Sequence, residues 1–171
     1  HVYNGMTPFN HRANGLVGAA YRMKSMYGEI ICDGNHSTPA ALRMFFDAKG
    51  PHYGIMVSDA LMAKGSPVGS KFIFGGNEIE IYEDGSAHLT SSKGLAGSTL
   101  RLNDGLRILI EEALVPIDTA INSCTKNPAA CLHIDDRKGA VKVGLDADLV
   151  VLDRDYQVLQ TYCRGRAMLG E

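Results

Sequence analysis

A strand–helix–strand unit in the first third of the chain constrains the fold more than any other feature. Residues 28–32 (GEIIC) and 53–57 (YGIMV) are short apolar runs of the kind that form buried strands. Between them, Thr38-Pro39 begins a helical pattern that ends at Lys49-Gly50. Threonine suits the N-cap and proline the first helical position. Two buried strands joined by a helix pair in parallel, so the sequence predicts an α/β fold.

The pattern changes near residue 70, where alternating polar and apolar residues predict a β-hairpin excursion over residues 70–92. The Asp84-Gly85 dipeptide within it is a strong hairpin signal. The other elements are predicted from pattern alone: residues 1–20 as mostly loop, 103–114 and 116–130 as helices, and 149–152 and 158–164 as strands of a small antiparallel unit.

Composition excludes several classes of protein. The 17 Lys and Arg residues are balanced by 19 Asp and Glu, which argues against a nucleic-acid partner. No apolar run approaches the roughly 20 residues that span a bilayer, so no membrane association is expected. The cysteines, Cys32, Cys124, Cys131 and Cys163, are dispersed and form no CxxC pair. We expect four buried or half-buried free thiols in a reducing, cytoplasmic compartment.

The chain is short for the fold that this unit suggests. A complete (β/α)₈ barrel needs about 250 residues. The chain has 171 residues and begins at His1 rather than at a methionine. If the βα unit belongs to a barrel, we expect the chain to be the back part of a longer protein and to lack the first half.

Four polar segments lie where βα proteins build their sites, at or near the ends of predicted strands. The imidazole of His1 can bind a metal, and the guanidinium of Arg12 can pair with a phosphate or carboxylate. His36 can contact a polar ligand, and Asp59 can act as general base on a metal-bound water. In the fourth segment, Gly94–Ser98, glycines let backbone amides approach a ligand closely.

Each segment also has a purely structural interpretation. His1 can be an exposed terminal residue, and the loop at Asp33 can be an Asx turn that leads into a helix cap. Asp59 can cap the segment that follows it, and residues 94–98 can be a tight turn before a helix. The individual segments leave both interpretations open.

Taken together and in order, the motifs resemble the C-terminal half of the N-acetylglucosamine-6-phosphate deacetylase family, within the amidohydrolase superfamily. The resemblance covers nearly the whole chain and rests on HVYNGM with Arg12, GLVG, DGNH, VSDA, LAGS, NPAA and GLDADLVVL. The opening motif with its arginine and the DGNH loop are the more specific pieces. The last motif is common to many amidohydrolases.

The resemblance implies a fold and an activity. Residues 1–138 are expected to be the C-terminal part of a (β/α)₈ TIM-like barrel, and residues 139–171 strands of a small β-sandwich domain. The expected reaction is the metal-dependent deacetylation of N-acetylglucosamine 6-phosphate to glucosamine 6-phosphate and acetate. The family also implies a homodimer, in which some members place residues in the neighbour's site.

The resemblance further implies a role for each matching residue. Asp59 matches the catalytic aspartate, His1 a metal ligand and Arg12 the phosphate-binding arginine. The expected substrate contacts are Asn4, Gly5, Asp33, Gly34, Asn35, His36, Leu95, Ala96 and Gly97. The implied cofactor is a divalent metal ion, zinc first, with iron or another divalent ion as the alternative.

The sequence departs from the family in one respect. The family's metal-binding glutamate and a further histidine belong to the half that precedes residue 1, and a catalytic zinc generally uses three protein ligands. Two other interpretations therefore stand beside the deacetylase. One is a non-catalytic piece that retains only phosphosugar binding or assembly contacts. The other is an amidohydrolase that acts on a different N-acyl or cyclic amide.

Overall fold

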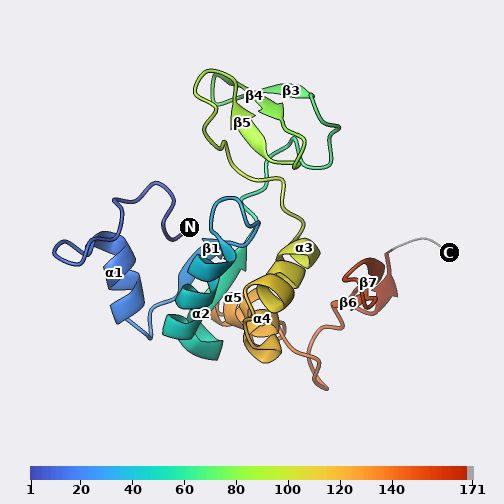
Figure 1. Cartoon of the computed structure of the whole chain (residues 1–171). Helices are drawn as coiled ribbons and strands as arrows, with labels where there is room; N and C mark the ends of the chain where they lie inside the picture. Colours follow the sequence, from blue (N-terminus) through green and yellow to red (C-terminus); the bar gives the residue numbers. More distant parts are fainter. Residues whose placement is uncertain (169–171) are drawn as a thin grey trace.

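The computed structural model describes residues 1–168 and shows a mixed α/β chain (Figure 1). The strands of this part form three separate sheets, β1-β2, β3-β4-β5 and β6-β7-β8. The helices are α1 (Gly15–Arg22), α2 (Pro39–Tyr53), α3 (Leu102–Arg107), the π-helical segment η1 (Ile108–Glu112), α4 (Ile117–Cys124) and α5 (Lys126–Cys131). The strands are β1 (Gly28–Ile31), β2 (Gly54–Val57), β3 (Lys71–Phe74), β4 (Asn77–Ile81), β5 (Ala87–Leu89), β6 (Leu149–Leu152), β7 (Val158–Cys163) and β8 (Arg166–Ala167).

The predicted strand–helix–strand unit is confirmed. Strands β1 and β2 pair in parallel, with Ile31 opposite Val57. The side chain of Thr38 accepts a hydrogen bond from Ala41 N at 3.3 Å, so the predicted N-cap of α2 forms. The regular helix ends at Gly50, whose φ of 63° interrupts it, and one more turn leads into β2. Because both strands of this unit run in the same direction, the loops that follow them leave the same end of the sheet.

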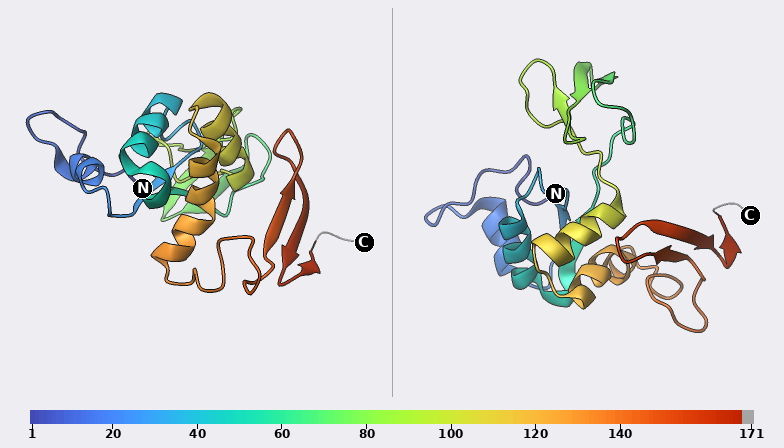
Figure 2. Two further views of the ribbon diagram at one scale, coloured as in Figure 1. Left: turned by 90° about the horizontal axis from the view of Figure 1, so that it is seen from below. Right: turned by 45° about the vertical axis from the view of Figure 1, so that its right-hand side comes forward.

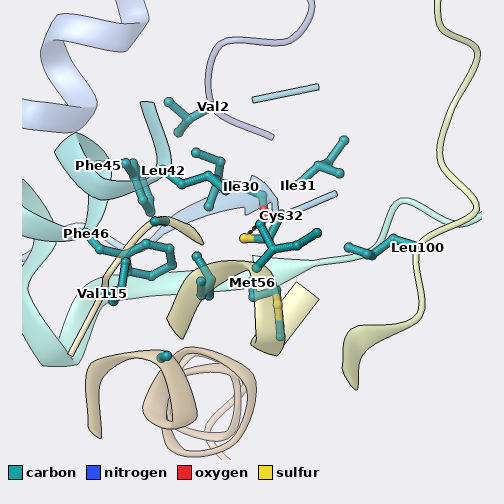
Figure 3. Close-up of a cluster of buried hydrophobic side chains, with 14 of the residues drawn as sticks. Val2, Ile30, Ile31, Cys32, Leu42, Phe45, Phe46, Met56, Leu100 and Val115 are labelled. Carbon is teal, nitrogen blue, oxygen red and sulfur yellow. Dashed lines mark hydrogen bonds between the residues drawn. The ribbon is translucent and has the colours of Figure 1, made fainter. Parts of the chain in front are cut away.

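The main core holds this unit together (Figure 3). Leu42, Phe45 and Phe46 of α2 belong to one buried cluster with Ile30 and Ile31 of β1. Each of these five side chains is at most 2% exposed. Burying a side chain of this size contributes about 1.5–3 kcal/mol. Phe45 and Phe46 are therefore core residues.

The predicted β-hairpin excursion is also confirmed. Strands β3, β4 and β5 form an antiparallel sheet that projects from the α/β core on two connecting segments (Figures 1 and 2). This sheet has a small core of its own, which we call the hairpin core: Ala63, Ile79, Ile81, Ala87 and Ala96. The excursion is thus a small folded unit that projects from the α/β core and has its own buried residues.

The prediction that residues 1–20 are mostly loop is wrong for the segment that forms α1. We expected Gly15 and Gly18 to break a helix here. Instead α1 buries Val17 and Ala20 against the main core, and this packing outweighs the low helix propensity of glycine. At Gly18 a Cβ would lie 2.2 Å from the Cβ of Asn14. That glycine therefore allows close packing rather than ending the helix.

The helices after the excursion differ from the predicted ranges in detail. The helix expected over 103–114 becomes π-helical at Ile108–Glu112. The break expected near Asn127 occurs at Thr125, whose φ of −130° and ψ of −80° separate α4 from α5. Within residues 1–168, no helix is long and apolar enough to cross a membrane.

The C-terminal strands form one antiparallel sheet, as predicted from their pattern. Lys138 is paired with Asp146 and Asp148, and this ion cluster ties the preceding loop to the start of β6. The assignment of this sheet to a β-sandwich domain stays a prediction.

One cysteine prediction is wrong. Cys32 is buried and Cys124 and Cys131 are half-buried, but Cys163 is exposed, because the strand that ends with it packs little of its surface.

Candidate active site

The candidate residues converge at the C-terminal edge of the parallel strands. Asp33 and Asp59 each lie two residues beyond the last paired residues of β1 and β2, which are Ile31 and Val57. Because these strands are parallel and in register, both aspartates leave the same edge of the sheet. On β1, Glu29 O accepts a hydrogen bond of 2.7 Å from Val2 N, so the start of the opening segment lies against that strand. The loops of Asp33 and Asp59 therefore leave one edge of the sheet, and the start of the opening segment contacts its first strand.

The loop at Asp33 is held by its own carboxylate. Asp33 Oδ1 accepts from Asn35 N at 2.9 Å and from His36 N at 2.8 Å, and Oδ2 lies 2.6 Å from His36 Nδ1. Burial raises the pKa of the Asp33 carboxyl, but the hydrogen bonds from His36 and Asn35 outweigh it, so this pKa lies below its usual range. The structural interpretation of this loop as an Asx turn is confirmed. The turn also presents the Asn35 backbone and side chain at the sheet edge.

The Asp33 turn predicts a pH-dependent contribution to stability. A carboxyl with a lowered pKa in the folded state stabilises the fold above its unfolded pKa of about 3.9 and loses that effect as the pH falls through the folded value. Asp33→Asn should therefore lower the free energy of unfolding by about 1–3 kcal/mol at pH 7 and by less at pH 3. Urea unfolding at both pH values measures this difference.

The matched control for this measurement is Asp47→Asn on α2. Asp47 forms an exposed pair with Arg43 one helical turn away, at 2.9 Å, and such pairs contribute only about 0.3–0.5 kcal/mol. An equal loss for Asp33→Asn at pH 7 and pH 3 would contradict a charge-dependent role for the turn.

Asp59 is linked directly to the fourth segment. Its carbonyl oxygen accepts a hydrogen bond of 2.8 Å from Ser98 N, and Ser98 O accepts one of 2.8 Å from Leu61 N. The two segments thus form a short parallel bridge. Asp59 is exposed, and its φ of 48° is unusual for a residue other than glycine. Residues of this kind are often found where backbone strain is part of a functional site.

A polar cleft of about 480 Å³ lies between the Asp33 turn, the tip of the β4–β5 hairpin and the start of α3. Among the predicted site residues, Asp33, Asn35 and Gly97 line it. Other residues that line the cleft are not among the site residues predicted from the sequence: Asp84, Ser86, Arg101, Asp104 and Arg107. Arg101 lies three residues after the predicted loop at 94–98 and two before the helix predicted over 103–114, and this position between them is the signal that could have indicated it.

The opening segment is only partly at this site. His1 is exposed, and its ring lies close to Gly5, where a Cβ would be 3.8 Å from His1 Cε1. Arg12 belongs to an exposed loop before α1, and its backbone N–H donates to Asn10 Oδ1 at 2.9 Å. Arg12 does not line the cleft. The structure therefore brings together the other three segments and leaves Arg12 apart from them.

The side chains of residues 1–168 do not make up a complete metal site. In this part of the chain, no three His, Cys, Asp or Glu side chains lie together in a way that could hold a metal ion. His1 and Asp59 are donors of a suitable type, but a catalytic zinc generally needs three protein ligands. The donor set thus does not fit a zinc ion on its own.

Comparison with known proteins places this arrangement in a class. Residues 68–168 match the amidohydrolase family, which is more than half of the chain. The chain therefore belongs to the amidohydrolase family, whose deacetylases are generally dependent on a divalent metal.

Particular relatives carry more specific names. The chain is 41% identical to N-acetylglucosamine-6-phosphate deacetylase of Bacillus subtilis, over 96% of this chain and 41% of that protein. It is 35% identical to a putative N-acetylgalactosamine-6-phosphate deacetylase of Escherichia coli K12, over 97% of both chains. A structure of the Mycobacterium smegmatis N-acetyl-D-glucosamine-6-phosphate deacetylase, a mutant in complex with N-acetyl-D-glucosamine-6-phosphate, is similar with a TM-score of 0.90 and 28% identity, over 98% of this chain and 44% of that one.

The chain thus spans about two fifths of the length of the Bacillus subtilis relative and nearly all of the Escherichia coli K12 relative. The similarity to the solved deacetylase supports the resemblance first seen in the motifs.

Proposed function

We propose that this chain carries the C-terminal part of the active site of an N-acetylhexosamine-6-phosphate deacetylase, with N-acetylglucosamine 6-phosphate as substrate. The observation that carries the proposal is the position of Asp59. It follows β2 at the sheet edge, next to the Asp33 turn and bridged to Ser98 of the predicted sugar-contacting loop. In a βα protein this edge is where catalytic groups are placed.

In the proposed reaction, water attacks the carbonyl carbon of the N-acetyl group. The carboxylate of Asp59 takes a proton from the water and delivers it to the amide nitrogen as the C–N bond breaks. The products are acetate and the free amine of glucosamine 6-phosphate. Deacetylases of the family generally depend on a divalent metal, and residues 1–168 offer His1 toward it but no three-ligand cluster.

The other predicted site residues supply the proposed contacts to the substrate. We propose that Asn35 and the backbone of Gly34 contact the sugar from the Asp33 turn, with His36 held in place by the Asp33 carboxylate. Gly97 lines the cleft, and Leu95, Ala96 and Gly97 would cover the sugar from that side. Asn4 and Gly5 would contact it from the segment beside β1, and Arg12 would bind the phosphate.

The barrel, the domain division and the assembly belong to the same proposal. Residues 1–138 would be the C-terminal part of a (β/α)₈ barrel, and residues 139–171 would contribute strands to a small β-sandwich. The enzyme would be a cytoplasmic homodimer, zinc its first candidate metal and His1 one of the ligands. The family match and the TM-score of 0.90 to the Mycobacterium smegmatis deacetylase support the barrel part of this proposal.

The direct test is acetate release. An enzyme that contains this chain together with the family's remaining metal ligands, supplied with zinc, should release acetate from N-acetylglucosamine 6-phosphate much faster than from unphosphorylated N-acetylglucosamine, because the phosphate orients the reacting amide. N-acetylgalactosamine 6-phosphate belongs in the same panel, since the Escherichia coli K12 relative is named for that sugar. A preference for an unrelated N-acyl or cyclic amide would refute the proposed substrate.

The second candidate is a chain that binds the phosphosugar without turning it over. The absence of a three-ligand metal cluster within residues 1–168 favours it. Calorimetry with glucosamine 6-phosphate separates the two, because binding without acetate release would support the non-catalytic function.

A further inference from the structure

The backbone of Asp59 is held in a costly conformation. A residue other than glycine in the left-handed region costs about 1–3 kcal/mol and persists only where its surroundings hold it. At Asp59, φ is 48°. The nearest constraint is the bridge to Ser98, whose N–H donates to Asp59 O and whose carbonyl accepts from Leu61 N, both at 2.8 Å. Ser98 is only 2% exposed, so this bridge is shielded from water.

The side chain of Leu61 supports this bridge from outside. It lies directly over Gly97, where a Cβ would be 2.7 Å from Leu61 Cδ2. Gly97 has a φ of 61° and precedes Ser98, so Leu61 covers the backbone of the loop that carries the other half of the bridge. Leu61 therefore contacts this loop through its side chain and through its backbone.

Leu61 also packs against the hairpin core, the cluster to which Ala63 and Ala96 belong. The loop is joined to the same sheet, since Ala96 N donates to Ala87 O at 3.0 Å and Leu89 N donates to Gly94 O at 2.9 Å. Thr99 Oγ1 in turn donates to Gly85 O at 2.5 Å. The β3–β5 sheet thus supports both the loop and the segment that follows Asp59.

We infer that Leu61 is a positioning residue, which fixes Asp59 relative to the Leu95–Gly97 loop by packing both against the hairpin core. This inference rests on the proposed function, in which Asp59 transfers the proton and the loop covers the sugar. The inference assigns the β3–β5 sheet a role in the active site, whereas the sequence pattern predicted only a β-hairpin excursion. The sheet sets the distance between the catalytic carboxylate and the bound sugar.

The test compares Leu61→Ala with Phe72→Ala. Phe72 of β3 packs against the same hairpin core but belongs to neither the Asp59 segment nor the loop. Leu61→Ala should lower kcat by about 10- to 100-fold with little change in KM, because a small displacement of a catalytic group is enough to slow the reaction that much. Phe72→Ala should keep the wild-type kcat, and Leu61→Met, which conserves volume, should restore most of it.

Hydrogen exchange supplies a readout that does not depend on activity. The Ser98 amide, bonded to Asp59 O, should exchange at least about 10-fold faster in Leu61→Ala than in Phe72→Ala. An unchanged Ser98 amide, or an equal loss of kcat in the two alanine variants, would overturn the inference. If the wild-type protein releases no acetate, the proposed function fails, and the exchange measurement alone decides whether Leu61 holds Asp59.

Discussion

Asp59→Asn is expected to lower kcat for N-acetylglucosamine 6-phosphate by about 10²–10⁴-fold, with KM changed less than a few-fold. The amide cannot accept the water's proton and deliver it to the leaving nitrogen. Asparagine is a sharp probe at this position because it tolerates the left-handed backbone at least as well as aspartate. The φ of 48° at Asp59 is thus retained, and the effect of lost proton transfer is separated from backbone strain.

The measurement combines initial rates of acetate release with calorimetric binding of the substrate to the variant. Binding should remain within a few-fold of wild type, since the bridge from Asp59 O to Ser98 N uses only the backbone. Asp47→Asn, on the exposed face of α2, is the control for a neutralised carboxylate and should keep full activity. Wild-type turnover in Asp59→Asn would remove this residue from the mechanism.

The sequence predicted the parts of the fold that depend on local patterns. The two apolar runs around a capped helix became β1, α2 and β2, and the Asp84-Gly85 turn became the β4–β5 hairpin. The helix α1 was missed, because its formation depends on Val17 and Ala20 finding the main core rather than on its glycine-rich sequence. Burial of this kind is a tertiary effect that propensity does not contain.

The candidate site shows the same division. Asp33 and Asp59 follow strands, so the sequence could place both at one sheet edge. The bridge between Asp59 and Ser98 joins residues that the β3–β5 sheet separates along the chain, and no spacing rule connects them. Leu61 and Arg101 were overlooked for the same reason. Their surroundings are created by the position of the β3–β5 sheet and of α3, and neither residue has a motif of its own.

Arg12→Ala is expected to raise KM for N-acetylglucosamine 6-phosphate by about 10- to 100-fold, the size of effect that loss of a charge-assisted hydrogen bond gives. The unphosphorylated sugar should be hydrolysed at the same low rate by the variant and by the wild type. Initial rates on both sugars measure this contrast. Arg22→Ala, which removes a second exposed arginine at the end of the following helix, is the matched control and should leave KM unchanged. An equal effect of Arg12→Ala on the two sugars would contradict phosphate binding.

The position of Arg12 allows a sharper form of the same experiment. Its loop is exposed and does not line the cleft that Asp33 and Gly97 share. The family resemblance implies a homodimer in which some members place residues in the neighbour's site, so we expect Arg12 to serve the other subunit. Arg12→Ala and Asp59→Asn, each defective alone, should then complement each other when mixed and reassembled. Half of the dimers would be mixed, and each would contain one site with both residues intact. Activity should return to about a quarter of wild type at a substrate concentration that Arg12→Ala uses poorly. If Arg12 acts within its own subunit, every site in a mixed dimer lacks one of the two residues, and mixing restores nothing.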